Sequence, residues 1–382
     1  MKLNNLRLVF KYALVVLLIA CCGGTALYSR ALHTNASASS AGSMIVLEAS
    51  TNRILNQQNA YSKRYMASTT KILTAITAIK NCDVEDIVAV DKKAVGVEGS
   101  SIYLQAGEKL RVLDLLYGLM LQSGNDTAVA LAIHIGGSVE KFAEMMNQTA
   151  KLAGATNSNF VNPHGLHHDN HYTTAYDLGL ISTYALKDSI FAKIVATKSH
   201  TVDRPAKGWK HEIKNKNKIL HSFEGGDGVK TGFTKKAGRC LVSSATRNGM
   251  QVVCVVLNCG PMFEECRALM QRAFNNYSLV NVLQSYEFAG IANVKNGRVE
   301  EVGAYSHKAL YYPLRKEEHE QVTKLVEFDE LKAPIAKDQK IGKILIKLHD
   351  RVLFDQDLFS IDKVQSINIM DKLRQLLPDW LS

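Results

Sequence analysis

Residues 66–80 read MASTTKILTAITAIK, and this stretch decides which kind of domain surrounds it. From Ile72 to Ile79 the apolar side chains lie on nearly every side of a helix with about 3.6 residues per turn. A helix that is apolar all round has to be covered by neighbouring elements. We therefore predict a buried helix over residues 66–80.

Around this helix the hydrophobic periodicity predicts further elements. The expected helices occupy residues 112–121, 127–135 and 263–277. The expected strands occupy residues 43–48, 230–234, 241–245 and 252–257. Asn248-Gly249 separates the last two strands and is typical of a tight hairpin. Helices beside an antiparallel sheet form an α+β domain, which we place at residues 41–278.

The pattern changes beyond about Val280. Short β-forming runs, separated by turn residues and charges, occupy residues 294–302, 310–314, 322–328 and 344–348. Asn296-Gly297 marks another reversal. We predict a small all-β domain over residues 283–363, and we find no catalytic cluster in its sequence.

The chain ends in a stripe of apolar residues with helical spacing. Ile369, Leu373 and Trp380 belong to this stripe, and the charged residues fall elsewhere. Such an amphipathic helix, predicted over residues 366–382, can lie in a membrane interface. A helix packed on its own β domain is the alternative, and the nearby Pro378 and the mixed charges favour it.

The first 40 residues are typical of an export segment. Three cations precede an apolar run at residues 12–20, and small residues follow, as in a secretory signal peptide. Ala36-Ser37-Ala38 is the ordinary cleavage candidate. The alternatives are a signal-anchor and a lipoprotein signal that would lipidate Cys21. We expect a signal peptide or signal-anchor and linker over residues 1–40, and a location at the extracytoplasmic face of the bacterial cell membrane or in the cell wall.

Charge and cysteine content narrow the classes of partner. The net charge of +10 indicates anionic surroundings. Export argues against nucleic acid, whereas cell-wall polymers and anionic lipid headgroups fit the charge. Five cysteines follow the signal segment, and no CxxC pair occurs. An odd number without that spacing does not indicate a disulfide framework or a zinc site.

Three short motifs follow one another in the predicted α+β domain. They are Ser68-Thr69-Thr70-Lys71, Ser123-Gly124-Asn125 and Lys230-Thr231-Gly232. Residues three apart on a helix share a face, so Lys71 can serve as the base for the Ser68 hydroxyl. Lysine is a base only when it is neutral, and burial together with a second cation, Lys230, would lower its pKa. These are the parts of a serine acyl-transfer site.

The second motif and two backbone groups would complete the chemistry. Ser123 can relay a proton between the base and the leaving amine. Asn125 offers an amide to the substrate backbone and to the lysine pair. The backbone N–H groups of Ser68 and Phe233 would be the oxyanion donors.

The third motif predicts a binding edge. Lys230 can bind a free carboxylate as a point charge, and Thr231 can add a hydroxyl. Gly232 would let an extended substrate approach the strand edge without a Cβ clash. Such an edge can pair with a peptide by strand addition.

Each triplet is common on its own. Ser138-Val139-Glu140-Lys141 also has the SxxK spacing, and Ser366-Ile367-Asn368 has the SxN spacing. Neither has its partner motifs in order, so we interpret both as chance. The histidine-rich segment 164–171 has the residue types of a zinc site. Its irregular spacing on a polar loop favours a structural loop instead, and we expect neither a metal nor a cofactor.

The motifs resemble those of the penicillin-binding, active-site-serine acyltransferases, and most closely the low-molecular-mass D-alanyl-D-alanine carboxypeptidases of peptidase family S11. The segments that carry the resemblance are MASTTK (66–71), LQSGND (121–126), NPHGL (162–166), YTTAYDL (172–178) and KTGFT (230–234). The resemblance implies a β-lactamase/transpeptidase-like domain followed by a small β domain and a terminal helix. It also implies that Ser68 is acylated by the penultimate D-alanine of a peptidoglycan stem peptide, and that β-lactam antibiotics inhibit the enzyme.

Other functions use related parts. A class A β-lactamase would place a glutamate in an E-x-x-L-N segment, and none stands between Asn125 and Lys230. A transpeptidase or endopeptidase shares the acyl-enzyme chemistry and differs only in the acceptor. A wall-binding scaffold with an inactive site is the alternative from another class. The leading hypothesis is a carboxypeptidase that trims peptidoglycan stem peptides outside the cell.

Overall fold

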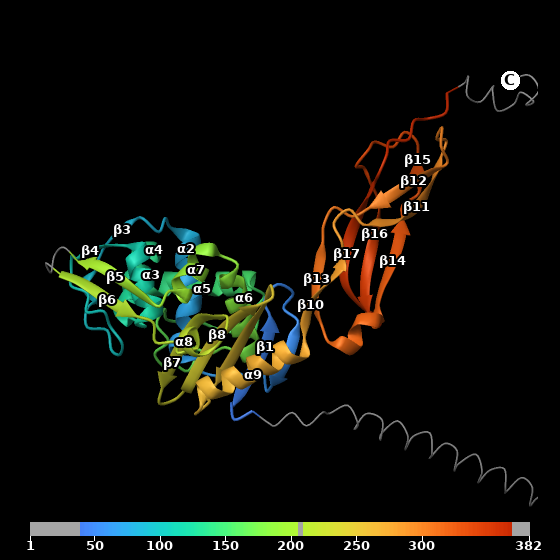
Figure 1. Ribbon diagram of the computed structural model, residues 1–382. Coiled ribbons are helices and arrows are strands. Elements are labelled where there is room, and N and C mark those ends of the chain that lie inside the picture. Colours follow the sequence, from blue (N-terminus) through green and yellow to red (C-terminus); the bar gives the residue numbers. More distant parts are fainter. Residues whose placement is uncertain (1–38, 205–208, 369–382) are drawn as a thin grey trace, which may run out of the picture. The chain divides into compact units, whose positions relative to one another are not determined.

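The structure is a computed structural model, and it describes residues 39–204 and 209–368 of the 382-residue chain. The predicted export segment lies almost entirely outside these residues. An antiparallel sheet with helices on both faces occupies the region 43–277, and a second set of strands occupies the region 278–368 (Figure 1). The first region contains all three motifs.

A five-stranded antiparallel sheet supports the first region, with the strand order β2-β1-β9-β8-β7. The strands are β1 (Ser43–Glu48), β2 (Ile54–Gln58), β7 (Gly226–Thr234), β8 (Gly238–Arg247) and β9 (Met250–Leu257). Asn248 and Gly249 join β8 to β9 with φ angles of 49° and 78°. Positive φ at both positions is what a two-residue hairpin turn of type I′ requires. The predicted hairpin is therefore confirmed, and β7 lies at one edge of the sheet.

Alternate residues of the central strands face two separate cores. Ile45 and Val255 pack into the larger core beneath the helices. Val46 and Cys254 pack on the other face, in a core that includes side chains of α9 (Met262–Asn276). Figure 1 shows α9 beside the sheet. Because both faces are covered, β1 is buried at every position instead of alternating between apolar and polar residues.

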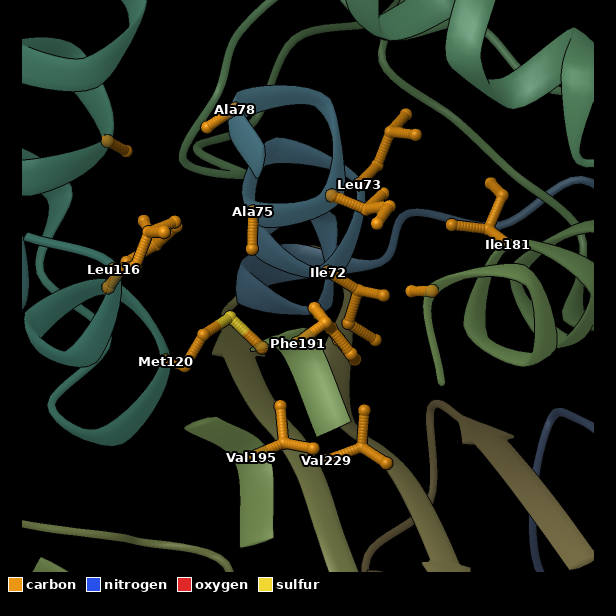
Figure 2. Close-up of a cluster of buried hydrophobic side chains, with 14 of the residues drawn as sticks. Ile72, Leu73, Ala75, Ala78, Leu116, Met120, Ile181, Phe191, Val195 and Val229 are labelled. Carbon is orange, nitrogen blue, oxygen red and sulfur yellow. The ribbon is translucent and has the colours of Figure 1, made fainter. Parts of the chain in front are cut away.

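The helix α2 (Lys71–Asn81) lies inside the larger core, as the sequence predicts. Figure 2 shows Ile72 and Ala75 of this helix among Leu116, Phe191 and Val229, which come from three other elements. One detail differs from the prediction. Residues Ala67–Thr70 form a 3₁₀ turn, so the α-helix begins at Lys71 and not at residue 66.

Five further helices pack around α2. They are α3 (Val112–Leu121), α4 (Asn125–Gly136), α5 (Val139–Leu152), α6 (Ala175–Leu186) and α7 (Ser189–Ala196). The smaller elements are the hairpins β3 (Ile87–Ala89) with β4 (Lys109–Arg111) and β5 (Ser199–Arg204) with β6 (Trp209–Lys214), and the helical turn α8 (Ile219–Ser222). The predicted helices at 112–121, 127–135 and 263–277 are confirmed within a few residues.

The second region is all-β, as predicted, with its own core. A six-stranded sheet has the order β14-β16-β17-β12-β11-β15, and β10 pairs with β13. The strands are β10 (Ser278–Leu283), β11 (Phe288–Lys295), β12 (Glu301–Tyr305), β13 (Leu310–Leu314), β14 (Val322–Phe328), β15 (Leu331–Lys332), β16 (Lys340–Leu348) and β17 (Arg351–Ser360). Asn296-Gly297 lies between β11 and β12, where a reversal is predicted.

The predicted terminal helix needs one correction. Ser366 forms a β-bridge with Gly297, and Ile367 donates its N–H to the Asn296 carbonyl, so residues 366–368 do not begin a helix. The rest of the stretch lies outside the described residues. Within the segments that the structure describes, no helix is long and apolar enough to cross a membrane.

Candidate active site

Ser68 lies in the 3₁₀ turn Ala67–Thr70, called the Ser68 turn below, and side chains of this turn stabilise it. Thr69 Oγ1 donates to the Met66 carbonyl at 2.6 Å, and Thr70 Oγ1 donates to the Ala67 carbonyl at 2.8 Å. Because residues i and i+3 of a 3₁₀ turn eclipse one another, Ser68 and Lys71 lie on the same side. Lys71 Nζ is 3.1 Å from Ser68 Oγ. The predicted nucleophile and base are therefore in hydrogen-bond contact.

Lys71 is fully buried, yet it contacts only neutral acceptors. Its Nζ lies 2.6 Å from Asn125 Oδ1 and 2.6 Å from the His164 carbonyl. Burial holds the pKa of Lys71 well below its ordinary value, and the positive charge of Lys230 lowers the pKa further. Asp126 opposes this shift without reversing it. The pKa shift predicted for Lys71 is confirmed in direction and in both causes.

The second motif lies at the junction of α3 and α4. Ser123 has a φ of 65°, and Asn125 is the first residue of α4. The Asn125 side chain uses both ends of its amide, because Oδ1 accepts from Lys71 and Nδ2 donates to the Glu98 carbonyl at 2.5 Å. Asn125 thus ties the base to the loop that contains Glu98, a contact that the sequence does not predict.

The third motif lies on the edge strand β7, as predicted. Lys230 is 1% exposed and donates to the Thr231 carbonyl at 2.9 Å. Burial lowers the pKa of Lys230 to about 7, and Lys216 contributes to the same shift. Lys216, which bonds to the Gln122 carbonyl at 3.0 Å, is a further cation of this site that the sequence motifs do not include.

Gly232 has a different neighbour from the one that we predicted. A Cβ at this position would lie 3.0 Å from the Ser68 nitrogen and 3.1 Å from the Met66 carbonyl oxygen. The absence of a side chain at Gly232 therefore lets the Ser68 turn pack against β7. This is a second reason for a glycine, besides the predicted approach of a substrate. Phe233, the next residue, is 64% exposed.

The histidine-rich loop packs beside the Ser68 turn. Burial lowers the pKa of His164 to about 4, and Lys71 adds to the effect, so the imidazole is neutral near pH 7. A Cβ on Gly165 would lie 1.9 Å from the Ala67 carbonyl oxygen, which shows how closely the loop meets the turn. Within the described residues, no three His, Cys, Asp or Glu side chains are grouped so that they could hold a metal ion.

Known proteins resemble this chain over most of its length. The family model described as D-alanyl-D-alanine carboxypeptidase matches residues 30–260, and the model of the C-terminal domain of penicillin-binding protein 5 matches residues 277–366. The chain is 29% identical to the D-alanyl-D-alanine carboxypeptidase DacF of Bacillus subtilis over 91% of this chain and 92% of that protein. It is 30% identical to DacA of Haemophilus influenzae over 88% and 87% of the two chains.

A solved structure matches over the same length. Penicillin-binding protein 5 from Haemophilus influenzae superimposes with a TM-score of 0.73 at 28% identity, covering 87% of this chain and all of the other. The match spans both regions, so the pairing of a transpeptidase-like domain with an all-β domain is confirmed.

Proposed function

The chain belongs to the D-alanyl-D-alanine carboxypeptidase family (peptidase S11), and on that premise we propose which of its residues carry the reaction. It is a serine-type D-Ala-D-Ala carboxypeptidase of peptidoglycan metabolism. Ser68 is the nucleophile, Lys71 the general base and Ser123 the proton relay. The substrate is the stem pentapeptide, and β-lactam antibiotics acylate the same serine.

The contacts of Lys71 carry this assignment. A neutral lysine amine has two N–H donors and one lone pair, arranged tetrahedrally. Asn125 Oδ1 and the His164 carbonyl, each 2.6 Å away, are acceptors and can take the two N–H groups. The lone pair then faces the third neighbour, Ser68 Oγ at 3.1 Å. A lowered pKa and a lone pair directed toward a serine hydroxyl support the proposed role of Lys71 as the general base.

The reaction has two acyl-transfer steps. Ser68 Oγ attacks the carbonyl carbon of the penultimate D-alanine as its proton passes to Lys71 Nζ. The tetrahedral oxyanion accepts hydrogen bonds from the backbone N–H groups of Ser68 and Phe233. The C–N bond breaks, and the proton passes through Ser123 to the departing D-alanine amine. Water then attacks the ester, which releases the shortened peptide and restores the Ser68 hydroxyl.

Substrate binding involves the edge strand. The terminal carboxylate of the peptide binds the Lys230 ammonium and the Thr231 hydroxyl. The peptide backbone adds to β7, which lies at the end of the strand order, with the Asn125 amide on its other side. The close fit of Gly232 against the Ser68 turn keeps this strand next to the nucleophile.

Release of D-alanine from a stem pentapeptide tests the assignment. The Ser68→Ala variant should release none, and it should take no covalent label from penicillin in intact-mass spectrometry. Ser138→Ala is the matched control, because Ser138 has the same spacing to a lysine but only caps α5, through a 3.2 Å bond from the Lys141 N–H. D-Alanine release that survives in Ser68→Ala would overturn the proposal.

The related acyltransferases are separated by the fate of the acyl group. A β-lactamase would turn over labelled penicillin rapidly, whereas a carboxypeptidase should keep the label for minutes or longer. A transpeptidase would transfer the acyl group to an added amine acceptor in preference to water. Retention of label together with D-alanine release would support the carboxypeptidase.

We also propose that the chain is exported and that its C-terminal residues contact the membrane surface. The support is the signal-like order of residues 1–40 and the apolar stripe in residues 369–382. Mass spectrometry of the protein recovered from cells should show an N-terminus cleaved near residue 38 or a lipid on Cys21. Vesicle sedimentation of the full chain and of a chain that ends at Asn368 should differ if the tail binds lipid.

A further inference from the structure

His171 is buried beside the Ser68 turn and has no part in the chemistry proposed above. Its ring is 2% exposed, and its Nδ1 accepts the Val161 N–H at 3.1 Å. A neutral imidazole that accepts at one nitrogen carries its proton on the other. The proton is therefore on Nε2, which lies 2.9 Å from Thr70 Oγ1, and His171 donates a hydrogen bond to the Thr70 hydroxyl.

The Thr70 hydroxyl links His171 to the backbone of the Ser68 turn. It accepts from His171 and donates to the Ala67 carbonyl oxygen at 2.8 Å. Three hydrogen bonds thus run in one direction, from the Val161 N–H through His171 and Thr70 to Ala67. Bonds in such a chain polarise one another. The two bonds made by the Thr70 hydroxyl are buried, whereas the bond from the Val161 N–H is partly buried.

The hydrogen bond from Thr70 to the Ala67 carbonyl affects the peptide unit that joins Ala67 to Ser68. In a planar trans peptide, the C=O of Ala67 and the N–H of Ser68 point in opposite directions. Any group that fixes the direction of the Ala67 carbonyl therefore fixes the direction of the Ser68 N–H. Ala67 has a φ of 49°, a conformation that a residue with a side chain seldom adopts without outside support.

We propose that His171 is a positioning residue for the oxyanion hole. Through Thr70, it holds the Ala67–Ser68 peptide plane so that the Ser68 N–H points at the reacting carbonyl. The inference rests on the proposed function, in which the Ser68 N–H is an oxyanion donor. A purely structural role, in which the bonds only attach the loop 161–171 to α2, is the alternative.

The chain offers a matched control for this alternative. Thr74 lies one turn further along α2, is equally buried, and donates from Oγ1 to the Pro163 carbonyl of the same loop at 2.6 Å. Thr74→Val and Thr70→Val therefore each remove one buried hydroxyl that bonds a backbone carbonyl. Only Thr70→Val removes a hydrogen bond to the Ala67 carbonyl.

The experiment measures acylation by labelled penicillin and separates the rate constant of acylation from the dissociation constant of the initial complex. Removing an oxyanion donor costs about 10²–10³-fold in rate, and misdirecting one should cost about 10–10²-fold. We expect a loss of that size in Thr70→Val and His171→Leu, with little change in the dissociation constant. Thr74→Val should acylate as fast as the unaltered enzyme, although its melting temperature should fall because a buried hydrogen bond is lost.

Conservative variants should restore the rate. Thr70→Ser keeps the hydroxyl, and His171→Gln offers a carbonyl acceptor and an NH₂ donor in place of the imidazole. The infrared band of the acyl-enzyme carbonyl gives an independent readout, because a carbonyl that loses a hydrogen bond absorbs at higher frequency. We expect an upward shift in Thr70→Val and none in Thr74→Val.

Two results would overturn the inference: equal acylation rates in Thr70→Val and Thr74→Val, or an acyl carbonyl band that does not move in Thr70→Val. If His171→Leu fails to fold, the two threonine variants still decide the question. Failure of the proposed function would appear differently, as an absence of label on Ser68 in the unaltered enzyme.

Discussion

The two regions of the molecule treat charge in opposite ways. In the region 43–277, Lys71, Arg204 and Lys230 are at most 1% exposed. The all-β region 278–368 is called the strand region below. Its buried polar residues are serines, and its charged residues pair across strands at the surface. Because burying a charge is costly, each buried charge in the first region requires a physical reason.

The hydrogen-bond partners of the buried cations indicate two different reasons for their burial. Arg204 is paired with Glu108 and also donates to the carbonyls of Ile102 and Tyr103, so its charge is neutralised and each of its three nitrogens has an acceptor. Lys71 and Lys230 are held by neutral oxygens, and their pKa values are lowered. Burial alone therefore does not identify a reactive group. Burial without a neutralising partner does, since it makes a neutral amine available at Lys71 and leaves the ammonium of Lys230 free to pair with a substrate carboxylate.

Replacement of Lys71 should have the largest effect on activity. We expect Lys71→Met to lower kcat/KM for D-alanine release by about 10²–10⁴-fold, because the general base is lost. Its folding free energy should change little, since relief of a buried amine opposes the loss of hydrogen bonds to two acceptors. Lys80→Met is the control on the same helix, because Lys80 is an exposed partner of Asp188. Equal activity losses in the two variants would remove the distinction between the lysines.

Replacement of Arg204 should have the largest effect on stability. We expect Arg204→Met to cost about 3–5 kcal/mol of unfolding free energy in urea titration, because it leaves Glu108 buried without its partner. Arg111→Met is the control, since the Arg111 side chain is exposed and its buried partner Asp114 keeps a hydrogen bond to His200. A double variant, Arg204→Met with Glu108→Leu, should recover most of the loss. A small effect of Arg204→Met would show that the pair does not compensate a buried charge.

The pH dependence of acylation should report on Lys230. Lys230 binds a carboxylate only when protonated, so with a pKa of about 7 the second-order rate constant for penicillin should fall by about tenfold per pH unit well above that value. A penicillin methyl ester, which lacks the carboxylate, is the control and should not show this fall. A fall of equal steepness for the ester would exclude Lys230 as the cause.

Titration of Lys230 cannot lower the acylation rate at high pH by unfolding the protein. The folded pKa of Lys230 is lowered from 10.5 to about 7, so between these values the unfolded chain binds more protons than the folded one. Stability therefore rises with pH across this window as far as Lys230 is concerned. A loss of acylation above pH 7 that the methyl ester does not share would therefore be a loss of carboxylate binding.

The contrast between the lysines could be predicted from the sequence only in part. Ser68, Lys71 and Lys230 are recognisable because short motifs place them on predictable elements. Ser138 has the same SxxK spacing, and the structure shows that its hydroxyl caps α5. Lys216 has no such pattern around it, because it reaches the site from the segment between β6 and α8.

Other contributions depend on loops, which local periodicity does not describe. His171 reaches the Ser68 turn from a polar loop 101 residues away in sequence. The loop around Glu98 supports Asn125 through a backbone carbonyl, which any residue could provide. The hairpin β5–β6 and the strand β17 mix charged and apolar residues, so their sequences do not stand out as strands. Sequence reasoning thus finds the reacting groups more readily than the groups that position them.

The smallest effect is expected in the strand region. Lys343 pairs across strands with Glu327 at 3.2 Å and with Asp355 at 3.8 Å, and water screens both contacts. Lys343→Gln should leave the melting temperature unchanged within experimental error at physiological salt, and D-alanine release should also be unaffected. A destabilisation comparable to that of Arg204→Met would mean that surface pairs contribute as much as buried ones. In that case, burial would not distinguish a structural charge from a reactive one. Lys343→Gln therefore tests the comparison between the two regions, even though we expect the variant itself to have no effect.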